Sequence, residues 1–295
     1  MLQFLQLLVS GTAIGCIYAL IALGFVLIYK ATETVNFAQG DLMMIGGFAG
    51  LTAMTILGLP FALAFVVSVV AMALLGMATE RIVLRPLLGQ PAFTVLMATI
   101  GLGYLARGLV TMIPYWGTET HMLPVPYKDE VIWLGGRDGL VISIEHLVII
   151  LVTLALVVLL YVFFRHTRLG IAMQATSQNQ LAAFYMGIPV RRVNMLIWGL
   201  SSAICGAAGL LLAPITFVHA NMGLVGLKAF PAAVVGGFGS IPGALVGGLI
   251  IGIVESLSGF YLPEGFKDIA AYVFVLIMLV VKPNGLFGEN LTKKV

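Results

Sequence analysis

The chain has 295 residues, of which 61% are hydrophobic and only 9% are charged, and its formal net charge is +3. Its mean hydropathy is +1.11. A soluble domain needs roughly a quarter to a third of its surface residues to be charged, so this composition excludes a soluble globular protein. Because helices satisfy their own backbone hydrogen bonds in lipid, the expected fold class is all-α, a polytopic integral membrane protein.

Apolar runs that are long enough, or almost long enough, to cross a bilayer follow one another along the chain. They are expected near residues 5–29, 41–58, 60–79, 93–113, 144–164, 193–213, 222–240, 243–261 and 267–281. The seventh run contains Pro231 and the pair Gly236-Gly237, which are also typical of a broken or re-entrant segment. We therefore expect eight or nine transmembrane or re-entrant helices in a single membrane-embedded domain, residues 1–295.

The N-terminal run and the two cysteines show no sign of processing or of a cross-link. The first run begins next to Met1 without a basic region and continues to Tyr29, which is too long for a signal peptide, so a retained N-terminus is expected. Cys16 and Cys205 lie far apart in different apolar runs. This placement favours packing thiols over a disulfide or a thiolate metal site.

The charged residues of the short connections predict which side of the membrane each connection faces, because lysine and arginine accumulate on the cytoplasmic side. Three regions are basic and are assigned to that side, through Arg81, Arg85, Arg165, Arg168, Arg191, Arg192, Lys282, Lys293 and Lys294. The connection from Tyr115 to Ser143 is acidic and is assigned to the outside, with Glu119, Asp129, Glu130 and Asp138 against Lys128 and Arg137. Counting the crossings places the N-terminus outside and the C-terminus in the cytoplasm.

The longest cytoplasmic connection, RHTRLGIAMQATSQNQLAAFYMGIPVRRVN, has arginines near both ends and no acidic residue. Its pattern predicts a short helix that is capped by Thr176 or Ser177 and continues through Met186. Gly187 would end this helix in a left-handed conformation, and Pro189 would prevent its continuation.

The expected short helix has an apolar face and two small residues. Leu181, Phe184 or Tyr185, and Ile188 share one face at helical spacing, while Ala182 and Ala183 leave room for another backbone. Such a surface suits a docked partner. An amphipathic loop that lies on the lipid headgroups is the alternative.

The stretch LAAFYMG resembles the A-A-x-x-x-G core of the cytoplasmic motif through which permeases of ATP-binding-cassette (ABC) importers engage their ATPases. Leu181 stands where that motif usually has glutamate, and its distal proline is missing. Three further stretches, YALIALGFVLIYKATETVNFAQGDLMMIGGF, KAFPAAVVGGFGSIPGALVGGLIIGIVESL and VKPNGLFG, resemble the LivH-type permeases of branched-chain amino acid ABC transporters. The similarity spans nearly the whole chain.

The resemblance implies a bacterial inner-membrane importer with several partners. It implies a second related permease subunit, of the M type or a second copy, two cytoplasmic ATP-binding subunits and an external solute-binding protein. The solute would be leucine, isoleucine or valine, although similar permeases serve other amino acids, amides or urea. Lipid surrounds such a subunit, and nothing indicates nucleic acid or a cofactor.

The resemblance also implies where the ATPase would make contact. The contact residues would be Gln180, Leu181, Ala182, Ala183, Phe184, Tyr185, Gly187 and Ile188. No G-x-x-x-x-G-K-[ST] motif occurs in the chain, so energy from ATP would have to come from a partner. The chain itself is expected not to be an enzyme.

Two similar stretches, VNFAQGDLMMIGG and LKAFPAAVVGGFGSIPG, suggest a weak internal repeat of interrupted helices, which in transporters often line the central pathway. The alternative is that their glycines only permit close helix packing. The candidate pathway residues are Asn36, Gln39, Lys228, Phe230, Pro231, Gly236 and Gly237. Gln39 and Asp41 stand where related permeases commonly have histidine and glutamate, so a pH-linked role of that histidine does not transfer.

Other functional classes find little support. The stretch GLGYLA imitates a dinucleotide fingerprint but lies inside an apolar run. The four histidines lack metal-ligand spacing, and no metal or catalytic site is expected. An ion-coupled secondary transporter needs intramembrane acids, for which only Glu255 and the boundary residue Asp41 qualify.

Two charges, Arg107 and Glu255, lie well inside expected spans, both toward the external half of the membrane. An unpaired charge at the centre of a bilayer costs about 2.5 to 3.5 kcal/mol. Because snorkelling near a boundary lowers this cost, pairing is an option and not a necessity. One hypothesis is that the two residues pair across two helices and hold an external gate closed, and independent snorkelling of each side chain is the other.

Overall fold

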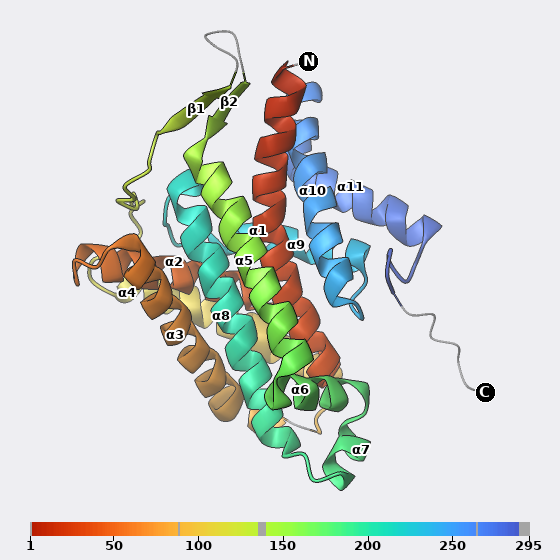
Figure 1. The fold of residues 1–295 in the computed structure, drawn as a ribbon. Coiled ribbons are helices and arrows are strands. Elements are labelled where there is room, and N and C mark those ends of the chain that lie inside the picture. The colour runs from red at the N-terminus through yellow and green to blue at the C-terminus, as the bar shows by residue number, and fades with distance from the viewer. Residues whose placement is uncertain (1, 88, 135–139, 264, 289–295) are drawn as a thin grey trace.

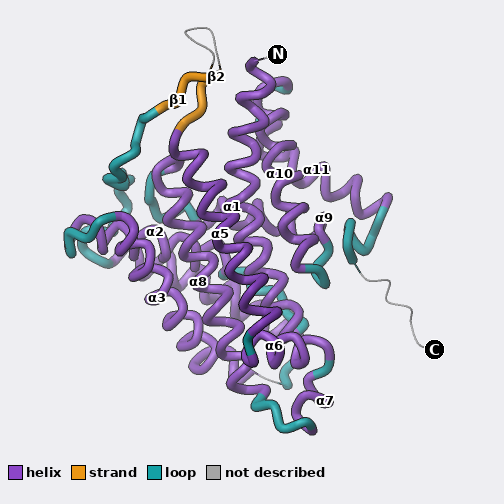
Figure 2. Tube along the Cα trace, viewed as in Figure 1, coloured by secondary structure: helices purple, strands orange, loops and turns teal. Residues whose placement is uncertain are grey.

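The computed structural model describes residues 2–87, 89–134, 140–263 and 265–288, and it is almost entirely helical (Figures 1 and 2). The helices are α1 (Leu2–Thr32), α2 (Gln39–Thr55), α3 (Phe61–Thr79), η1 (Glu80–Leu84, a π-helix), η2 (Arg85–Leu87), α4 (Ala92–Met112), α5 (Ile144–His166), α6 (Arg168–Gln178), α7 (Gln180–Tyr185), α8 (Val190–Thr216), α9 (Gly223–Gly236), α10 (Ile241–Tyr261) and α11 (Phe266–Val281). The strands are β1 (Val131–Leu134) and β2 (Leu140–Ser143). Arg137, Asp138, Lys293 and Lys294 lie outside the described residues.

Six helical segments of the described chain are long and apolar enough to cross a membrane: α1, α3 with its η1 and η2 extension, α4, α5, α8 and α10. The class of an all-helical polytopic membrane protein is therefore confirmed. The apolar helices α2, α9 and α11 have 17, 14 and 16 residues, which is shorter than the roughly 20 residues that a full crossing needs.

The antiparallel hairpin of β1 and β2 was not predicted. Its strands, VIWL and LVIS, are rich in β-branched and aromatic residues, which favour strand pairing. The connection from Tyr115 to Ser143 was predicted only to be acidic and external, and no strand was predicted in it. In Figure 1 this hairpin lies at the same end of the molecule as the N-terminal end of α1, and α6 and α7 lie at the opposite end.

Helices α1 and α8 form the buried centre, and α3, α4 and α5 lie at the periphery with few of their residues buried. Small residues allow α1 to approach α10 closely. A β-carbon on Gly252 of α10 would lie 2.3 Å from the Cα of Gly15 in α1, so only glycine fits at this crossing. Such contacts between small residues are how membrane helices pack without a hydrophobic driving force.

The molecule contains the same arrangement twice. A long central helix, a short break and a short helix follow one another as α1, 33–38 and α2, and again as α8, 217–222 and α9. The first central helix packs on α10 and α9, and the second packs on α3 and α2. The short helices meet near their N-termini, where a β-carbon on Gly226 would lie 2.2 Å from the Cα of Gly40.

The internal repeat suggested by the sequence is wrong in its pairing, because its two stretches do not occupy equivalent positions in this arrangement. The stretch LKAFPAAVVGGFGSIPG begins inside α9, whereas the break that corresponds to residues 33–38 precedes Gly223. The two stretches were compared because each contains a pair of glycines. In the structure the second pair, Gly236-Gly237, ends α9, with Gly237 at φ 98°.

The connection between α5 and α8 forms two helices, not one. Thr167 accepts a hydrogen bond from the backbone N–H of Gly170 (3.0 Å) at the start of α6. The side chain of Asn179 accepts one from the N–H of Ala182 (2.9 Å) at the start of α7. The expected caps Thr176 and Ser177 are wrong, because both lie inside α6 and donate to the carbonyls of Ala172 and Gln174 (both 2.8 Å).

Candidate functional site

A buried amide network joins the first break to both central helices. The Nδ2 of Asn36 donates to Gln39 Oε1 (2.9 Å), and Gln39 Nε2 donates to Ser201 Oγ and Cys205 Sγ (both 2.8 Å). Ser201 Oγ donates in turn to the carbonyl of Gly24 (3.0 Å). Asn36 and Gln39 are 0% exposed, so these two candidate pathway residues form a closed polar contact in the core.

Glycine at position 24 makes room for this network. A β-carbon there would lie 2.1 Å from Gln39 Nε2. Because a buried polar group without a partner is costly, the network fixes the direction in which the chain leaves the first break.

Beside the network lies an aromatic cluster centred on Phe230 of α9. Its ring centroid is 5.8 Å from that of Phe25, 5.6 Å from Phe37 and 5.5 Å from Phe238, and the rings of Phe238 and Tyr29 are 5.0 Å apart. Phe25 is fully buried, and the other four are half-buried. The cluster thus brings together aromatic rings from α1, from the first break, from α9 and from the connection between α9 and α10, in a form that can contact an apolar side chain.

The remaining pathway candidates of α9 have packing and turn positions. Pro231 and Gly236 are buried inside α9. A β-carbon on Gly236 would lie 2.0 Å from the carbonyl oxygen of Gly243 at the start of α10. Gly237 adopts a positive φ that favours glycine.

Arg107 and Glu255 do not pair, so the expected gate contact is wrong. Arg107 Nε donates to Asp41 Oδ1 at 2.5 Å, which links α4 to the first turn of α2. Glu255 lies on α10, which packs against α1, α9 and α11, whereas α4 packs against α2. The expectation failed because the sequence does not say which helices are neighbours.

Glu255 has partners of its own. Tyr18 Oη donates to Glu255 Oε2 at 2.5 Å, and Lys228 Nζ lies 3.1 Å from Glu255 Oε1. Lys228 Nζ also lies 2.7 Å from Asp268 Oδ1, at the start of α11. Lys228, a candidate pathway residue, therefore bridges two acids of α10 and α11.

The surface of α7 is apolar and uncovered. Leu181, Phe184, Tyr185 and Met186 are all more than 60% exposed, while Ala183 is buried. The left-handed conformation expected of the residue that ends this segment is confirmed, with φ 82° at Gly187. Ala182 is exposed and Ile188 is half-buried.

A groove with a volume of about 870 Å³ lies between α7 and the start of α8. It is lined by apolar and basic residues, among them Leu181, Phe184, Pro189, Arg191 and Arg192. Gln180 also lines the groove, and its Nε2 donates to the carbonyl of Ala31 at the end of α1. The sequence pattern did not indicate this contact.

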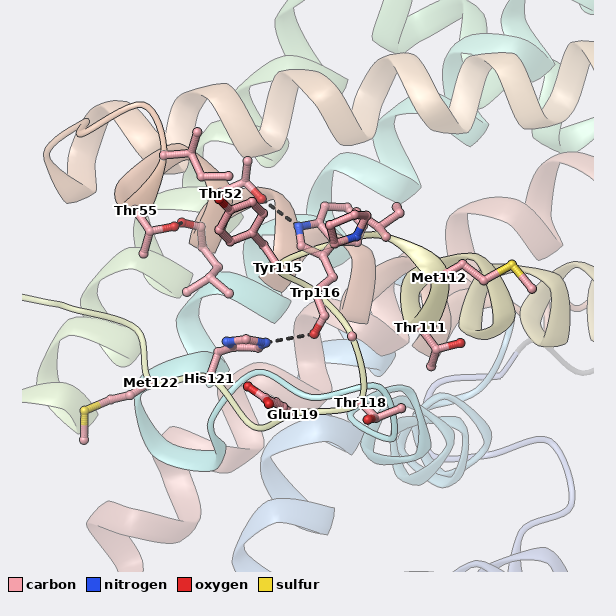
Figure 3. A pocket seen from close by; sticks show the side chains of 15 residues that line it. Thr52, Thr55, Thr111, Met112, Tyr115, Trp116, Thr118, Glu119, His121 and Met122 are labelled. Carbon is pink, nitrogen blue, oxygen red and sulfur yellow. Dashed lines mark hydrogen bonds between the residues drawn. The ribbon is translucent and has the colours of Figure 1, made fainter.

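A second hollow lies beyond the C-terminal ends of α2 and α4, with a volume of about 650 Å³ (Figure 3). Its wall is held by Trp116, whose Nε1 donates to Thr52 Oγ1 (2.8 Å) and whose carbonyl lies 2.8 Å from His121 Nε2. The Trp116 ring also stacks on Phe48. In the same connection after α4, burial raises the pKa of the Tyr127 phenol above its ordinary value. The described residues contain no cluster of three or more potential metal ligands.

The six membrane-length helices and the two interrupted central units define a multi-pass helical membrane protein. A family model described as the permease component of the branched-chain amino acid transport system matches residues 7–282. The chain belongs to this family. The resemblance found in the sequence is confirmed.

Curated relatives align with nearly the full length of the chain. The high-affinity branched-chain amino acid transport system permease protein LivH of Escherichia coli K12 is 32% identical, with 100% of this chain and 98% of the relative covered. BraD of Pseudomonas aeruginosa, which has the same description, is 31% identical, with 99% and 98% covered. The fructose import permease protein FruG of Bifidobacterium longum is 25% identical, with 95% and 88% covered.

A solved structure shares the fold. It is described as PsaBC from Streptococcus pneumoniae in complex with Fab, and the superposition has a TM-score of 0.51 at 16% sequence identity. It covers 96% of this chain and 94% of that chain. At this identity the likeness concerns the fold alone.

Proposed function

We propose that the chain is the transmembrane permease subunit of an ABC importer that moves leucine, isoleucine and valine into the cytoplasm, driven by two partner ATPases. The observation that carries this proposal is the full-length match to relatives described as branched-chain amino acid permeases. The subunit would lie in the inner membrane beside a second permease subunit and would receive its solute from an external binding protein.

The surface of α7 supports the assignment of an ATPase contact. Four large apolar side chains are exposed on one short segment, and basic residues border the adjacent groove. Exposed apolar patches of this kind mark protein interfaces. The end of the molecule that contains α7 is therefore the cytoplasmic end in this proposal, and the N-terminus and the β-hairpin face outward.

The aromatic cluster around Phe230 supports a solute with an apolar side chain. Phe37, Phe230 and Phe238 are partly exposed and lie next to one another, and a second permease subunit would complete a pathway beside them. The fructose permease among the relatives shows that similar chains serve other solutes. Other amino acids, amides and urea are accordingly the competing solutes.

An ion-coupled secondary transporter is the competing mechanism. Such a carrier uses intramembrane acids as ion sites. Here Asp41 is paired with Arg107, and Glu255 is bound by Tyr18 and Lys228. These partners favour structural roles for both acids.

The test is reconstitution of the chain with its candidate ATPases, second permease and binding protein in proteoliposomes. ATP-dependent uptake of leucine is expected, and no uptake is expected without ATP. Gly187→Val should abolish uptake while ATP hydrolysis and assembly persist, because a β-branched residue resists the left-handed conformation. Gly101→Val, at an exposed helical glycine with open space around it, is the matched control. Uptake by the chain alone in an ion gradient would refute the importer.

A further inference from the structure

Helix α7 has few attachments to the membrane-spanning part of the molecule. It has six residues, and its outward face is apolar and exposed. Within the described residues, a single side-chain hydrogen bond joins α7 to a membrane-length helix, and it is the one from Gln180 Nε2 to the carbonyl oxygen of Ala31. The remaining side-chain bond at this helix is its own cap at Asn179.

The acceptor of this bond is a carbonyl that the helix leaves without a partner. The last four carbonyls of a helix receive no intrahelical N–H, and Ala31 is the penultimate residue of α1. Ala31 is 1% exposed, so water does not readily replace the donor. Gln180 therefore supplies a hydrogen-bond donor to the C-terminal end of α1, the most deeply buried of the six membrane-length helices of the described chain.

The end of α1 leads directly into the first break. Five residues after Ala31, Asn36 enters the amide network with Gln39, and Phe37 between them contacts Phe230 in the aromatic cluster. A displacement of the C-terminal end of α1 therefore acts close to both the amide network and the aromatic cluster. Packed helices transmit such displacements because their contacts resist continuous deformation.

We propose that Gln180 is a positioning residue that ties α7 to α1, so that movement of α7 by an ATP-binding partner is transmitted to the break between α1 and α2. This inference rests on the proposed function. It assigns to Gln180 a role distinct from that of the apolar α7 residues. Gln180 is also exposed, but its side chain donates a hydrogen bond to α1, whereas the apolar side chains of α7 are left for the partner.

The test separates the hydrogen bond from the shape of the side chain. Gln180→Glu keeps the shape but replaces the donor with an oxygen that repels the carbonyl. Gln180→Lys restores an N–H donor beside a helix C-terminus, where a positive charge is favourable. Gln178→Glu is the matched control, because this glutamine is exposed and no hydrogen bond joins its side chain to the rest of the described chain.

The measured quantity is the number of solute molecules transported per ATP hydrolysed by the complete complex in proteoliposomes. Gln180→Glu should lower this ratio about fivefold to tenfold, as expected for loss of one hydrogen bond to a buried acceptor, with ATP hydrolysis and complex yield within about twofold of wild type. Gln180→Lys and Gln178→Glu should keep the wild-type ratio.

Two results would overturn the inference: a wild-type ratio in Gln180→Glu, or a defect in Gln180→Lys as large as that in Gln180→Glu. If Gln180→Glu prevents assembly, Gln180→Met, which is uncharged and similar in length, takes its place with the same expected loss. Failure of the wild-type chain to assemble with any ATPase would instead refute the proposed function and would be seen before the variants are compared.

Discussion

The two breaks in the central helices have the same position in the structural repeat but different surroundings. The first, between α1 and α2, is held in the core by Asn36 and Gln39. The second, between α8 and α9, begins with Phe217, which is 40% exposed and has a φ of 61°. Its next residue, Val218, pairs through the backbone with His121 in the connection after α4.

The ion pairs that follow the breaks also differ. The side chain of Asp41, which pairs with Arg107, is only 5% exposed. Lys228 pairs with two acids, Glu255, whose side chain is 4% exposed, and Asp268, whose side chain is 75% exposed. Exposed pairs contribute little to stability, and buried pairs are costly to break. The comparison indicates that the α2 half is the fixed half, and that in the α9 half the exposed contact of Lys228 with Asp268 can rearrange at lower cost than its buried contact with Glu255.

The largest expected effect comes from breaking the buried pair. Asp41→Asn should leave Arg107 without its counter-ion and destabilise the fold by about 3 kcal/mol, the lower end of the range for buried pairs because the arginine is partly exposed. Thermal unfolding in detergent measures this.

A double-mutant cycle sharpens that result. Asp41→Asn combined with Arg107→Gln should cost less than the sum of the two single changes. Arg107→Gln combined with Glu255→Gln is the control and should be additive within about 0.5 kcal/mol, since these residues do not touch. Additivity of the Asp41 and Arg107 changes would show that their contact contributes nothing.

An intermediate effect is expected from the amide network. Gln39→Leu removes the donor to Ser201 and Cys205 and the acceptor for Asn36, and it should destabilise the fold by about 1–3 kcal/mol. The same change at the exposed Gln178 should stay within about 0.5 kcal/mol. Equal melting temperatures for the two variants would remove the distinction between a fixed and a movable half.

The smallest effect is expected at the exposed pair. Asp268→Asn should change stability by about 0.2–1 kcal/mol, and this difference should shrink at high salt because solvent-exposed charges are screened. Unfolding curves at low and high ionic strength provide the measurement. A loss as large as that of Asp41→Asn would contradict the comparison.

Local features were predictable from the sequence because they depend on neighbours along the chain. Six of the nine expected apolar runs correspond to the membrane-length helices of the described chain, since length and hydropathy decide them, whereas the runs at 41–58, 222–240 and 267–281 form the shorter helices α2, α9 and α11. The left-handed Gly187 followed from the glycine and the proline after it. The helix cap was misplaced at Thr176 or Ser177, because Asn179 has equal capping ability and the sequence does not rank them.

Features that depend on helix neighbours were not predictable. Arg107 and Glu255 were matched by charge and depth alone, but each lies on a helix with other neighbours. The partners Asp41, Tyr18 and Lys228 come from segments far away in the chain. The candidate site therefore contains the expected Asn36, Gln39, Lys228 and Phe230, with contacts that only the packing of α1, α2, α8 and α9 defines.

The two native thiols have a practical consequence for spectroscopic work. Cys16 and Cys205 are both buried, so a maleimide fluorophore will react mainly with a cysteine introduced at an exposed site such as Asp129 or Gln178. Deleting the native cysteines first would not be neutral, because Cys205 Sγ accepts a hydrogen bond from Gln39. The unmodified chain is the better background for attaching probes on its two faces.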